Sequence, residues 1–472
     1  MTTNSENSSP LITHDIIIIG GGSAGYAAAR TAEAEGANVG IIDHGPLGGL
    51  CILRGCMPTK TILRSSDIAA LIRRAPEFGL TSSNLQADLN AIIERKDRLI
   101  KEFTDYRIEA LQDPKFTLYQ EKAHFLSPSV IQAGSHQLSA KAFIIATGSV
   151  VSRLPIPGLE ETGYLTSDDA LELRTPPDSM IVLGGGAVAM ELAQFFSRIG
   201  VKVSVIQRSA HILSQVDQDL AVAVETKLQE EGMTIYTNTS IEKVTRSSDG
   251  QKTVEFMHDG QPQQITASTI LQALGRHPNI DGLQLDTAQV AIHNNTISVN
   301  KSMQTSQPHI FAVGDVNGLH EIVHIAIEQG EIAAWNALHQ EQKLKHYDDR
   351  LKAQVTFTDP QVASVGLSER ECQTQDRPYL VASYPFNDHG KSLCLGETHG
   401  HVKILCTPQS GEVIGAHIVG PEASELIHEL ITIMYFHGTV RDLLRIPHYH
   451  PTLAEILTYP AEELADQLPP QS

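Results

Sequence analysis

A strand, a glycine-rich turn, a helix and a second strand occur twice in this chain, and this repeat constrains the fold more than any other feature. The first copy spans residues 15–43, and the second spans residues 180–207. Each opens with a continuous aliphatic run and continues into a turn that contains three or more small residues. We therefore expect an α/β chain with two Rossmann-like dinucleotide-binding domains.

The first turn contains Gly20, Gly22 and Gly25. In a turn of this type the first glycine makes the tight bend, the second lets the backbone approach a pyrophosphate, and the third lets the helix pack on the strand. Asp43 ends the second strand, where a carboxylate would accept hydrogen bonds from a ribose diol. A glycine-rich loop without a ligand is the alternative, but the flanking strand and helix favour a dinucleotide.

The second turn contains Gly184 and Gly186, with Ala189 at the third place. NAD-binding proteins usually carry an acidic residue after the second strand, whereas this chain has Gln207 followed by Arg208. An arginine there would pair with a 2′-phosphate. The second domain is therefore expected to bind NADPH, with NADH as the alternative if Arg208 is only a solvated loop residue.

Two cysteines five positions apart, Cys51 and Cys56, follow the first repeat. In a regular helix such positions have Cα atoms roughly 8–9 Å apart, whereas a disulfide rarely spans more than about 7 Å. A bridge between them would distort the start of a helix, with Gly55 supplying backbone freedom. A short, strained bridge beside a cofactor site would be catalytic. The alternative is a pair of buried, unrelated thiols.

Composition limits the partners and the location of the protein. Its 472 residues predict two to four domains. The net charge of −20 argues against a nucleic-acid partner or an anionic membrane surface. No apolar run predicts membrane insertion, no residue pattern predicts a bound metal, and five cysteines do not form a secreted disulfide framework. These features predict a cytoplasmic protein.

The two dinucleotide folds, the Cys-x4-Cys spacing and a third, C-terminal α+β domain together resemble the pyridine nucleotide–disulfide oxidoreductases. This is the flavoprotein family of dihydrolipoamide dehydrogenase, glutathione reductase and mercuric reductase. The resemblance covers about residues 14–460 and implies FAD in the first domain and NAD(P)H in the second. The expected segments are a disordered tail (1–14), the FAD-binding domain (15–150 and 273–346), the NAD(P)-binding domain (151–272) and the dimerisation domain (347–472).

The resemblance also implies cofactor contacts at strand ends and an ion pair beside flavin N5. Lys60 and Glu191 match the positions of that ion pair. Asp315 matches the residue that hydrogen-bonds the ribityl chain. The positions that match the family's cofactor motifs are Thr147, Gly148, Gly275, Arg276, Gly314 and Asp315.

The implied reaction passes two electrons between NAD(P)H and a disulfide substrate through FAD and the cysteine pair. By resemblance, Cys56 is the thiol next to the flavin and Cys51 the outer thiol that exchanges with substrate. His450, in a segment that resembles the family's His-Pro-Thr-x-x-Glu motif, would move the proton, and Glu455 would orient its imidazole. In the family this segment completes the partner subunit's site, so the resemblance implies a homodimer with shared active sites. His448 is expected to be structural.

The chain departs from the family's pattern beside the cysteines. Leu50 and Leu53 stand where Thr and Asn are usual, and Arg54 follows, which either contacts an anionic substrate or points to solvent. The C-terminal cysteine pair and N-terminal metal-binding domain of typical mercuric reductases are missing. We expect a dihydrolipoamide-dehydrogenase-like enzyme. The alternatives are a flavoenzyme that reduces a quinone, a metal ion or a second nicotinamide, and a non-catalytic FAD-binding protein.

Overall fold

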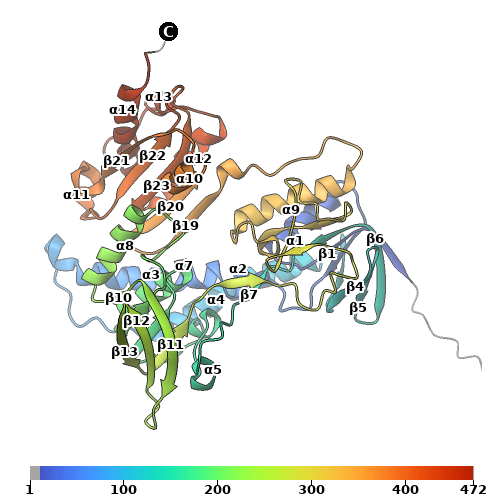
Figure 1. Ribbon diagram of the computed structural model, residues 1–472, viewed down its shortest axis with the longest axis horizontal. Coiled ribbons are helices and arrows are strands. Elements are labelled where there is room, and N and C mark those ends of the chain that lie inside the picture. Colours follow the sequence, from blue (N-terminus) through green and yellow to red (C-terminus); the bar gives the residue numbers. More distant parts are fainter. Residues whose placement is uncertain (1–10, 471–472) are drawn as a thin grey trace, which may run out of the picture. The chain divides into compact units, whose positions relative to one another are not determined.

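The computed structural model describes residues 11–470, which form two compact units. Unit 1 comprises the chain up to Pro58, Arg95–Ser152 and Arg276–Tyr347. Unit 2 comprises Thr59–Glu94, Arg153–Gly275 and the chain from Asp348 onward. Each unit is therefore assembled from segments that are distant in the sequence, as the colours of Figure 1 make visible.

Unit 1 is built around a mixed seven-stranded sheet with the order β3-β2-β1-β6-β5-β4, in which β18 also pairs with β6. The pairs β1–β2, β1–β6, β2–β3 and β6–β18 are parallel, whereas β4–β5 and β5–β6 are antiparallel. The strands are β1 (Ile12–Ile19), β2 (Val39–Ile42), β3 (Phe116–Tyr119), β4 (Ala123–Ser127), β5 (Val130–Ala133), β6 (His136–Ile145) and β18 (Ile310–Ala312).

Both faces of β1 are buried, which explains why its sequence is a continuous apolar run and does not alternate. Ile16 and Ile18 pack in one cluster with helices α1 (Ser23–Ala34) and α9 (Val323–Leu338). Ile17 and Ile19 pack in a second cluster with residues of the β4–β5 hairpin.

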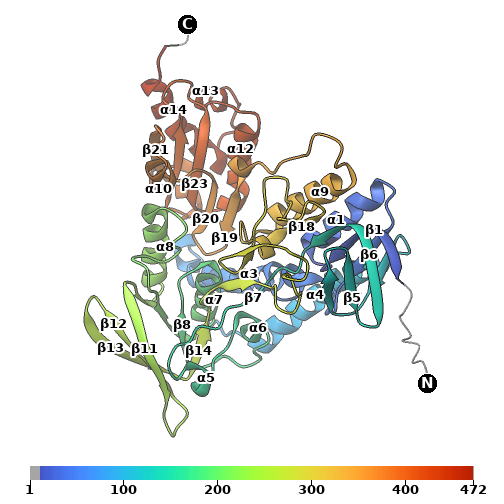
Figure 2. The same cartoon turned by 45° about the vertical axis from the view of Figure 1, so that its right-hand side comes forward.

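Helices α1 and α9 lie side by side, although about 300 residues separate them in the chain (Figures 1 and 2). A Cβ on Gly330 of α9 would lie 2.3 Å from the carbonyl oxygen of Ala24 in α1, so only glycine fits there. The return segment is thereby packed against the helix that follows the first glycine turn.

Unit 2 contains a parallel sheet with the order β10-β9-β8-β14 and a three-stranded antiparallel sheet with the order β11-β12-β13. Helices α7 (Ala187–Arg198) and α8 (Gln218–Glu230) pack in the same core as the parallel sheet. The strands are β8 (Ser179–Leu183), β9 (Lys202–Ile206), β10 (Thr234–Tyr236), β11 (Thr239–Arg246), β12 (Lys252–His258), β13 (Gln261–Ala267) and β14 (Thr269–Gln272).

The C-terminal part of unit 2 is a five-stranded antiparallel sheet with the order β19-β20-β23-β22-β21. Helices α12 (Ala423–Tyr435) and α14 (Thr458–Gln467) pack on it around a separate apolar cluster. The strands are β19 (Ala353–Thr356), β20 (Gln361–Gly366), β21 (Leu380–Pro385), β22 (His401–Cys406) and β23 (Val413–Gly420).

The remaining elements connect these sheets. They are α2 (Gly49–Leu53), α3 (Cys56–Arg73), α4 (Leu89–Leu111), α5 (Leu159–Thr162), α6 (Ser167–Ala170), α10 (Glu369–Thr374), α11 (Gly390–Leu395), α13 (Val440–Leu443), β7 (Ser149–Val151), β15 (Arg276–Pro278), β16 (Ile292–His293) and β17 (Thr296–Ile297).

The predicted fold class is confirmed, because both copies of the repeat form parallel strands joined by a helix, β1–α1–β2 and β8–α7–β9. Residues 1–10 of the expected tail lie outside the described residues. The end of that segment differs from the prediction: β1 begins at Ile12, and His14 is buried with its Nε2 2.9 Å from the hydroxyl of Tyr119.

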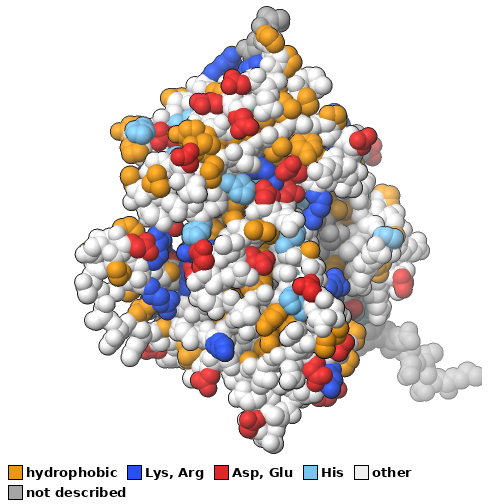
Figure 3. Space-filling model, turned by 60° about the vertical axis from the view of Figure 1, so that its left-hand side comes forward, with side chains coloured by type: hydrophobic (Ala, Val, Ile, Leu, Met, Phe, Trp, Pro, Cys, Tyr) orange, Lys and Arg blue, Asp and Glu red, His pale blue; other side chains and the backbone are white. Residues whose placement is uncertain are grey.

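The surface carries charges of both signs. On the face drawn in Figure 3, Lys and Arg side chains are interspersed among Asp and Glu. None of the helices between residues 11 and 470 is both long and apolar enough to cross a membrane.

Candidate active site

The first glycine turn has the shape that a pyrophosphate site requires. Gly20 has a φ of 106°, and a Cβ there would lie 2.3 Å from the carbonyl oxygen of Ala146. A Cβ on Gly25 would lie 1.8 Å from the carbonyl oxygen of Gly20, so α1 packs directly on the turn. Gly22 precedes α1 and provides no side-chain cap for its first N–H groups. Those N–H groups and the positive end of the helix dipole therefore fit a phosphate.

Asp43 follows β2 and is hydrogen-bonded to the same turn. Its Oδ2 accepts a hydrogen bond from the N–H of Gly21 at 2.7 Å, and its Oδ1 accepts one from the N–H of Gly45 at 2.8 Å. An ionised carboxylate has about four acceptor positions, so two remain for a ribose diol. The expected contact with the ribose stays a prediction, and the position of Asp43 at the turn is compatible with it.

The predicted second cofactor motif forms a connected set around Ser149. The Ser149 hydroxyl donates to Asp315 Oδ2 at 2.6 Å, and Arg276 Nε donates to the same hydroxyl at 2.9 Å. Arg276 Nη2 also donates to the Ser149 carbonyl at 2.7 Å. Gly314, just before Asp315, has a φ of 72°, and its N–H donates to Gln329 Oε1 at 2.8 Å. Segments from three parts of the sequence thus hold the Asp315 carboxylate in place.

Two strand-end turns border that set. Gly148 and Gly275 have φ values of 70° and 105°, in the region that favours glycine. The Thr147 hydroxyl donates to the carbonyl oxygen of Asn279 at 2.7 Å. Because β7 pairs antiparallel with β15, the turn at 147–148 lies beside Asn279, and the turn at 275–276 lies at the other end of the same ladder.

The cysteine loop is a break between two helices. Cys51 lies in α2, Cys56 begins α3, and both cysteines are half-buried. A Cβ on Gly55 would lie 3.0 Å from the carbonyl oxygen of Leu50, so the break is also tightly packed. The distortion that the spacing predicts is located here, although Gly55 is required by close packing and not by a positive φ. Arg54, which was expected either to contact an anionic substrate or to point to solvent, is exposed.

Backbone contact joins this loop to the first glycine turn. Gly49 has a φ of 77°, and a Cβ on it would lie 2.7 Å from the Cα of Gly22. No side chain larger than hydrogen therefore fits at position 49. The cysteine pair is therefore anchored to the turn that is expected to hold the FAD pyrophosphate.

The predicted ion pair between Lys60 and Glu191 is present in unit 2. Lys60 Nζ lies 2.8 Å from Glu191 Oε2, and Glu191 is buried. The other oxygen of Glu191 accepts a hydrogen bond from the N–H of Phe357 at 2.8 Å, and Lys60 Nζ lies 4.6 Å from the centre of the Phe357 ring. The pair is thus held on both sides, and its expected place beside the flavin stays a prediction.

The second glycine turn repeats the geometry of the first. Gly184 has a φ of 108°, and a Cβ there would lie 2.4 Å from the carbonyl oxygen of Ala273. Gly186 precedes α7 without a side-chain cap and has open space around it. Gln207 is buried against Gly185, whereas Arg208 is exposed. The turn fits a pyrophosphate, and Arg208 is the charged group that follows β9.

His450 and Glu455 are hydrogen-bonded within unit 2. His450 Nδ1 lies 2.8 Å from Glu455 Oε1, while 82% of the His450 side chain is exposed. A hydrogen bond from the Thr452 N–H at 2.7 Å and the contact with His450 hold the pKa of Glu455 below its usual range. His448 instead lies 2.9 Å from Glu429 Oε1 and 2.9 Å from the Ile446 carbonyl, which favours the predicted structural role.

Sequence reasoning missed three residues that complete these sets: Ser149, Gln329 and Phe357. Ser149 directly follows the predicted turn at 147–148, so its neighbourhood was a usable signal. Gln329 and Phe357 become visible only when distant segments meet, because neither belongs to a motif.

Comparisons with known proteins support the same assignment. Residues 14–330 match the pyridine nucleotide-disulphide oxidoreductase family, and residues 352–461 match its dimerisation domain. A mercuric reductase from Staphylococcus aureus is 34% identical over 430 residues, which are 90% of this chain and 78% of that protein. A dihydrolipoyl dehydrogenase from Bacillus subtilis is 32% identical over 425 residues, which are 89% of this chain and 92% of that protein.

A solved structure has the same fold. It is a Cu(II) complex of the HOCl-induced flavoprotein disulfide reductase RclA from Escherichia coli, with a TM-score of 0.83 and 23% sequence identity. The match covers 96% of this chain and 99% of that chain. Two kinds of observation lead to one conclusion. Both glycine turns precede helices that have no side-chain cap, and the family and its dimerisation domain match most of the chain. The chain belongs to the pyridine nucleotide-disulfide oxidoreductase family and is an FAD-dependent NAD(P)H:disulfide oxidoreductase that forms a homodimer.

Proposed function

We propose that this enzyme transfers electrons between NADPH and a small-molecule or protein-bound disulfide through a redox-active bond between Cys51 and Cys56. The observation that carries the proposal is the loop itself. Two half-buried cysteines flank a break between α2 and α3, and that loop contacts the first glycine turn through Gly49. A redox pair needs both access to substrate and a fixed distance from its cofactor, and this position supplies both.

The residues of unit 1 fit FAD. The first turn and the N-terminus of α1 would hold the pyrophosphate, Asp43 a ribose, and Asp315 the ribityl chain. When bound, FAD supplies the two-electron relay between the nicotinamide and the cysteine pair. Lys60 and Glu191 would form the charged pair beside the flavin, where the buried Glu191 fixes the position of the ammonium.

The cysteines perform thiol–disulfide exchange. Two electrons break the Cys51–Cys56 bond and leave two thiolates. The Cys51 thiolate attacks one sulfur of the substrate and forms a mixed disulfide, and the first product leaves as a thiolate that takes a proton from His450. Cys56 then attacks Cys51, which restores the internal disulfide and releases the second thiolate product.

Proton transfer is assigned to His450 of the partner subunit. The ring is exposed on its own subunit and is oriented through Nδ1 by Glu455, so Nε2 is available to a thiol or thiolate. Each active site in this proposal therefore combines the cysteines of one chain with the histidine of the other.

The test is spectroscopic reduction of the purified FAD-loaded enzyme with NADPH. Wild type should form a long-wavelength band, typical of a thiolate beside oxidised flavin, after two electrons. Cys56→Ser should abolish the band, and Cys51→Ser should keep it while losing turnover with disulfides. Cys394 is an exposed cysteine of unit 2, whereas Cys51 and Cys56 belong to unit 1, so Cys394→Ser is the control and should behave as wild type.

The outcome that contradicts the proposal is undiminished reduction of disulfides by Cys56→Ser. Undiminished reduction of quinones with no disulfide turnover in wild type would instead favour the flavoenzyme with a non-disulfide acceptor. A cytoplasmic location belongs to the same proposal, because a reducing compartment suits a disulfide that is opened and reformed in each turnover.

The preference for NADPH is assigned to Arg208. This exposed guanidinium follows β9, and the buried Gln207 before it leaves no carboxylate to repel a 2′-phosphate. Arg208→Ala should lower kcat/KM for NADPH by about 10-fold or more, with kcat/KM for NADH changed less than twofold. An unchanged ratio of the two values would contradict the role of Arg208.

A further inference from the structure

Two ion pairs connect α3, the helix that begins with Cys56, to α7. Lys60 Nζ of α3 lies 2.8 Å from Glu191 Oε2, and Asp67 Oδ1 of α3 lies 3.1 Å from Arg198 Nη1. The two residues of α3 are seven positions apart, and so are the two residues of α7. Seven residues are about two helical turns, or about 10.5 Å along the axis, so both pairs lie on one face of each helix. The two helices therefore run in the same direction with matched spacing of their contacts.

Apolar packing brings these helices together but does not specify their register. They lie side by side (Figures 1 and 2), and Ile62 of α3 belongs to the same core cluster as Met190 of α7. Apolar contacts are non-directional, so a helix displaced along its neighbour can still bury its aliphatic side chains. The ion pairs have opposite polarity, and a displacement of α3 by two turns would bring Lys60 against Arg198. Charge thus selects one register.

A turn of the C-terminal sheet holds α7 at the same two levels. Between β19 and β20, the Phe357 N–H donates to Glu191 Oε1 at 2.8 Å, and Asp359 Oδ2 accepts from Arg198 Nη2 at 2.6 Å. Between these levels, Gln194 accepts from the Asp359 N–H at 2.8 Å and donates to the Asp359 carbonyl at 2.8 Å. All three side chains of α7 are buried. The face of α7 that contacts α3 is therefore fixed.

Arg198 does not need Asp67 in order to be paired. Its Nη2 also lies 2.6 Å from Glu231 Oε1 and 2.6 Å from Asp359 Oδ2. The Asp67 side chain is 41% exposed, whereas that of Arg198 is 2% exposed. A third, partly exposed carboxylate adds little stability to an arginine that already has two. The best-attested use of such a pair is to specify register.

We propose that Asp67 and Arg198 are positioning residues, which set the register of α3 on α7 and thereby the place of Cys56 and Lys60 relative to the flavin. Cys56 is the first residue of α3, so a shift of the helix along its axis moves the Cys56 backbone with it. The step that depends on this register is the opening of the Cys51–Cys56 bond, in which two electrons leave the reduced flavin and two thiolates form. This inference rests on the proposed function, because it takes Cys56 as the thiol next to the flavin.

The absorbance of the FAD-loaded enzyme tests the proposal. After reduction with two electrons per FAD, wild type should form the long-wavelength band of a thiolate beside oxidised flavin. Asp67→Ala should lower this band about twofold or more and kcat with a disulfide about 10-fold, with KM changed less than about twofold, because reacting groups misplaced by about 1 Å react far more slowly. FAD content should equal that of wild type. Asp67→Glu, which keeps a carboxylate, should fall between wild type and Asp67→Ala.

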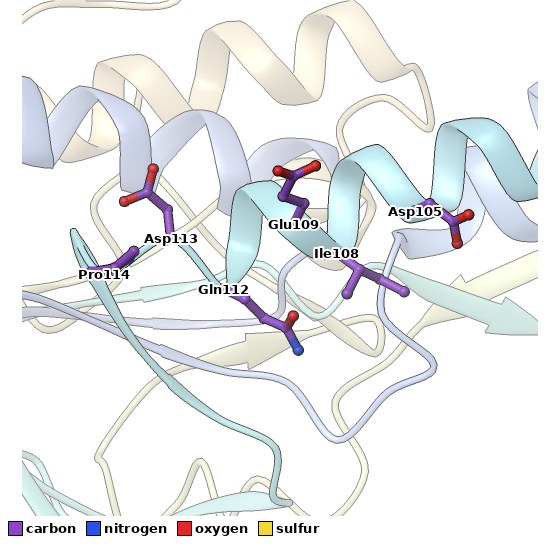
Figure 4. Close-up of a pocket in the computed structure, with 6 residues that line it drawn as sticks. All are labelled: Asp105, Ile108, Glu109, Gln112, Asp113 and Pro114. Atoms are coloured by element: carbon purple, nitrogen blue, oxygen red, sulfur yellow. The ribbon is translucent and has the colours of Figure 1, made fainter.

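Asp105→Ala is the matched control. Asp105 is an exposed residue of α4 that is paired with Lys101 of the same helix. Figure 4 shows its side chain at a hollow that Glu109 and Asp113 also line. The substitution removes a carboxylate and an ion pair, as Asp67→Ala does, but from another helix. The band and kcat should therefore be those of wild type.

Lys403→Met separates the effect of register from the effect of stability. Lys403 is a buried residue of β22 that is paired with Asp217, Asp219 and Glu369, so its loss destabilises unit 2. The folded fraction of this variant should keep the band and kcat per bound FAD.

Two outcomes overturn the role of Asp67. One is a band in Asp67→Ala that equals the wild-type band, whatever happens to turnover. The other is a band that weakens equally in Asp67→Ala and Lys403→Met, because lower stability would then be the cause. Failure of the proposed function has a different signature, since wild type itself would then form no band.

Discussion

Glu455 is hydrogen-bonded to the imidazole of His450, a ring that is largely exposed to solvent on its own subunit. Its two oxygens accept hydrogen bonds from the Thr452 N–H and from the ring of His450. Because those contacts lower the pKa of Glu455, the carboxylate is already ionised at pH 5 and stays so at higher pH. The charge that orients the His450 ring is therefore constant from pH 5 upward.

At the residue scale we predict that His450→Gln lowers kcat/KM for disulfides by about 100-fold or more. Glu455→Gln should cause a smaller loss, because the imidazole stays in place but loses the carboxylate that orients it. The measurement is kcat/KM from pH 5 to pH 9. Glu429→Gln, which removes the partner of His448, is the control and should stay within about threefold of wild type. A profile that moves with Glu429 and not with Glu455 would contradict the assignment.

Site residues were predictable where a motif fixes them locally. His450 and Glu455 lie five positions apart, and the structure places them in hydrogen-bond contact. Lys60 and Glu191 are 131 positions apart, and only the resemblance to the family connected them before the structure joined them.

At the element scale, Lys403 connects three elements of unit 2: strand β22, which contains it, and the helices α8 and α10. This fully buried ammonium lies 2.9 Å from Asp217, 2.9 Å from Asp219 and 3.0 Å from Glu369. The aspartates flank the start of α8, and Glu369 begins α10. One side chain thus joins the C-terminal sheet to the start of a helix in the nucleotide-binding part.

We predict that Lys403→Met lowers the free energy of unfolding by about 3–5 kcal/mol, because three carboxylates lose their common cation. Urea denaturation of the holoenzyme checks this. Lys243→Met, which breaks an exposed pair with Glu255, should change the same quantity by less than about 0.5 kcal/mol. Equal effects of the two substitutions would contradict the role of Lys403.

Arg198 is paired with three carboxylates, Asp67, Glu231 and Asp359, and this cluster gives a pH dependence of stability with a definite sign. Burial raises the pKa of Asp67 to about 6, against the opposing pull of Arg198. At pH 5 the folded protein therefore holds a proton that the unfolded chain has largely released. Because the folded state binds more protons, Asp67 makes the unfolding free energy fall as pH rises from about 4 to 6, and contributes no further change above that.

Asp67→Asn removes this dependence. The melting temperature of the variant should be close to that of wild type at pH 5. At pH 7 it should be higher than that of wild type. Thermal unfolding at both pH values measures this difference in melting temperature. Asp105→Asn, an exposed carboxylate on α4, is the control and should show no such change. A gap for Asp67→Asn that is equal at pH 5 and pH 7 would contradict the prediction.

Elements were predictable where periodicity is strong and less so at their boundaries. The run that became β1 was clear, but its start at Ile12 was not, because His14 is a polar residue whose partners, Asn38 and Tyr119, come later in the chain. The break between α2 and α3 lies where a bridge between Cys51 and Cys56 was expected to distort a helix, and the bridge itself stays a prediction. The contact of Gly49 with Gly22 was not predicted, because nothing in the sequence indicates that two distant glycines lie against each other.

At the scale of the whole molecule, the C-terminal part of unit 2 exposes large apolar side chains. Tyr449 is 82% exposed, Phe436 74% and Tyr435 61%. Aromatic residues exposed in this way are typical of an interface that a partner covers. They lie in the segment that matches the family's dimerisation domain.

If each site takes its histidine from the partner, two inactive variants should restore activity together. Cys51→Ser and His450→Gln subunits, denatured together and refolded with FAD, form mixed dimers with one intact site in each. Random pairing of equal amounts predicts about a quarter of wild-type activity. Each variant refolded alone is the control and should stay inactive. Absence of restored activity in verified mixed dimers would contradict a shared site.

The contact between Gly22 and Gly49 has a consequence for protein engineering. Since these two backbones touch without an intervening side chain, the cysteine loop and the nucleotide turn form one structural module. A chimera that imports the loop of a relative to change substrate preference must import the matching turn with it. Residues 20–56 contain both segments and can be exchanged as a unit.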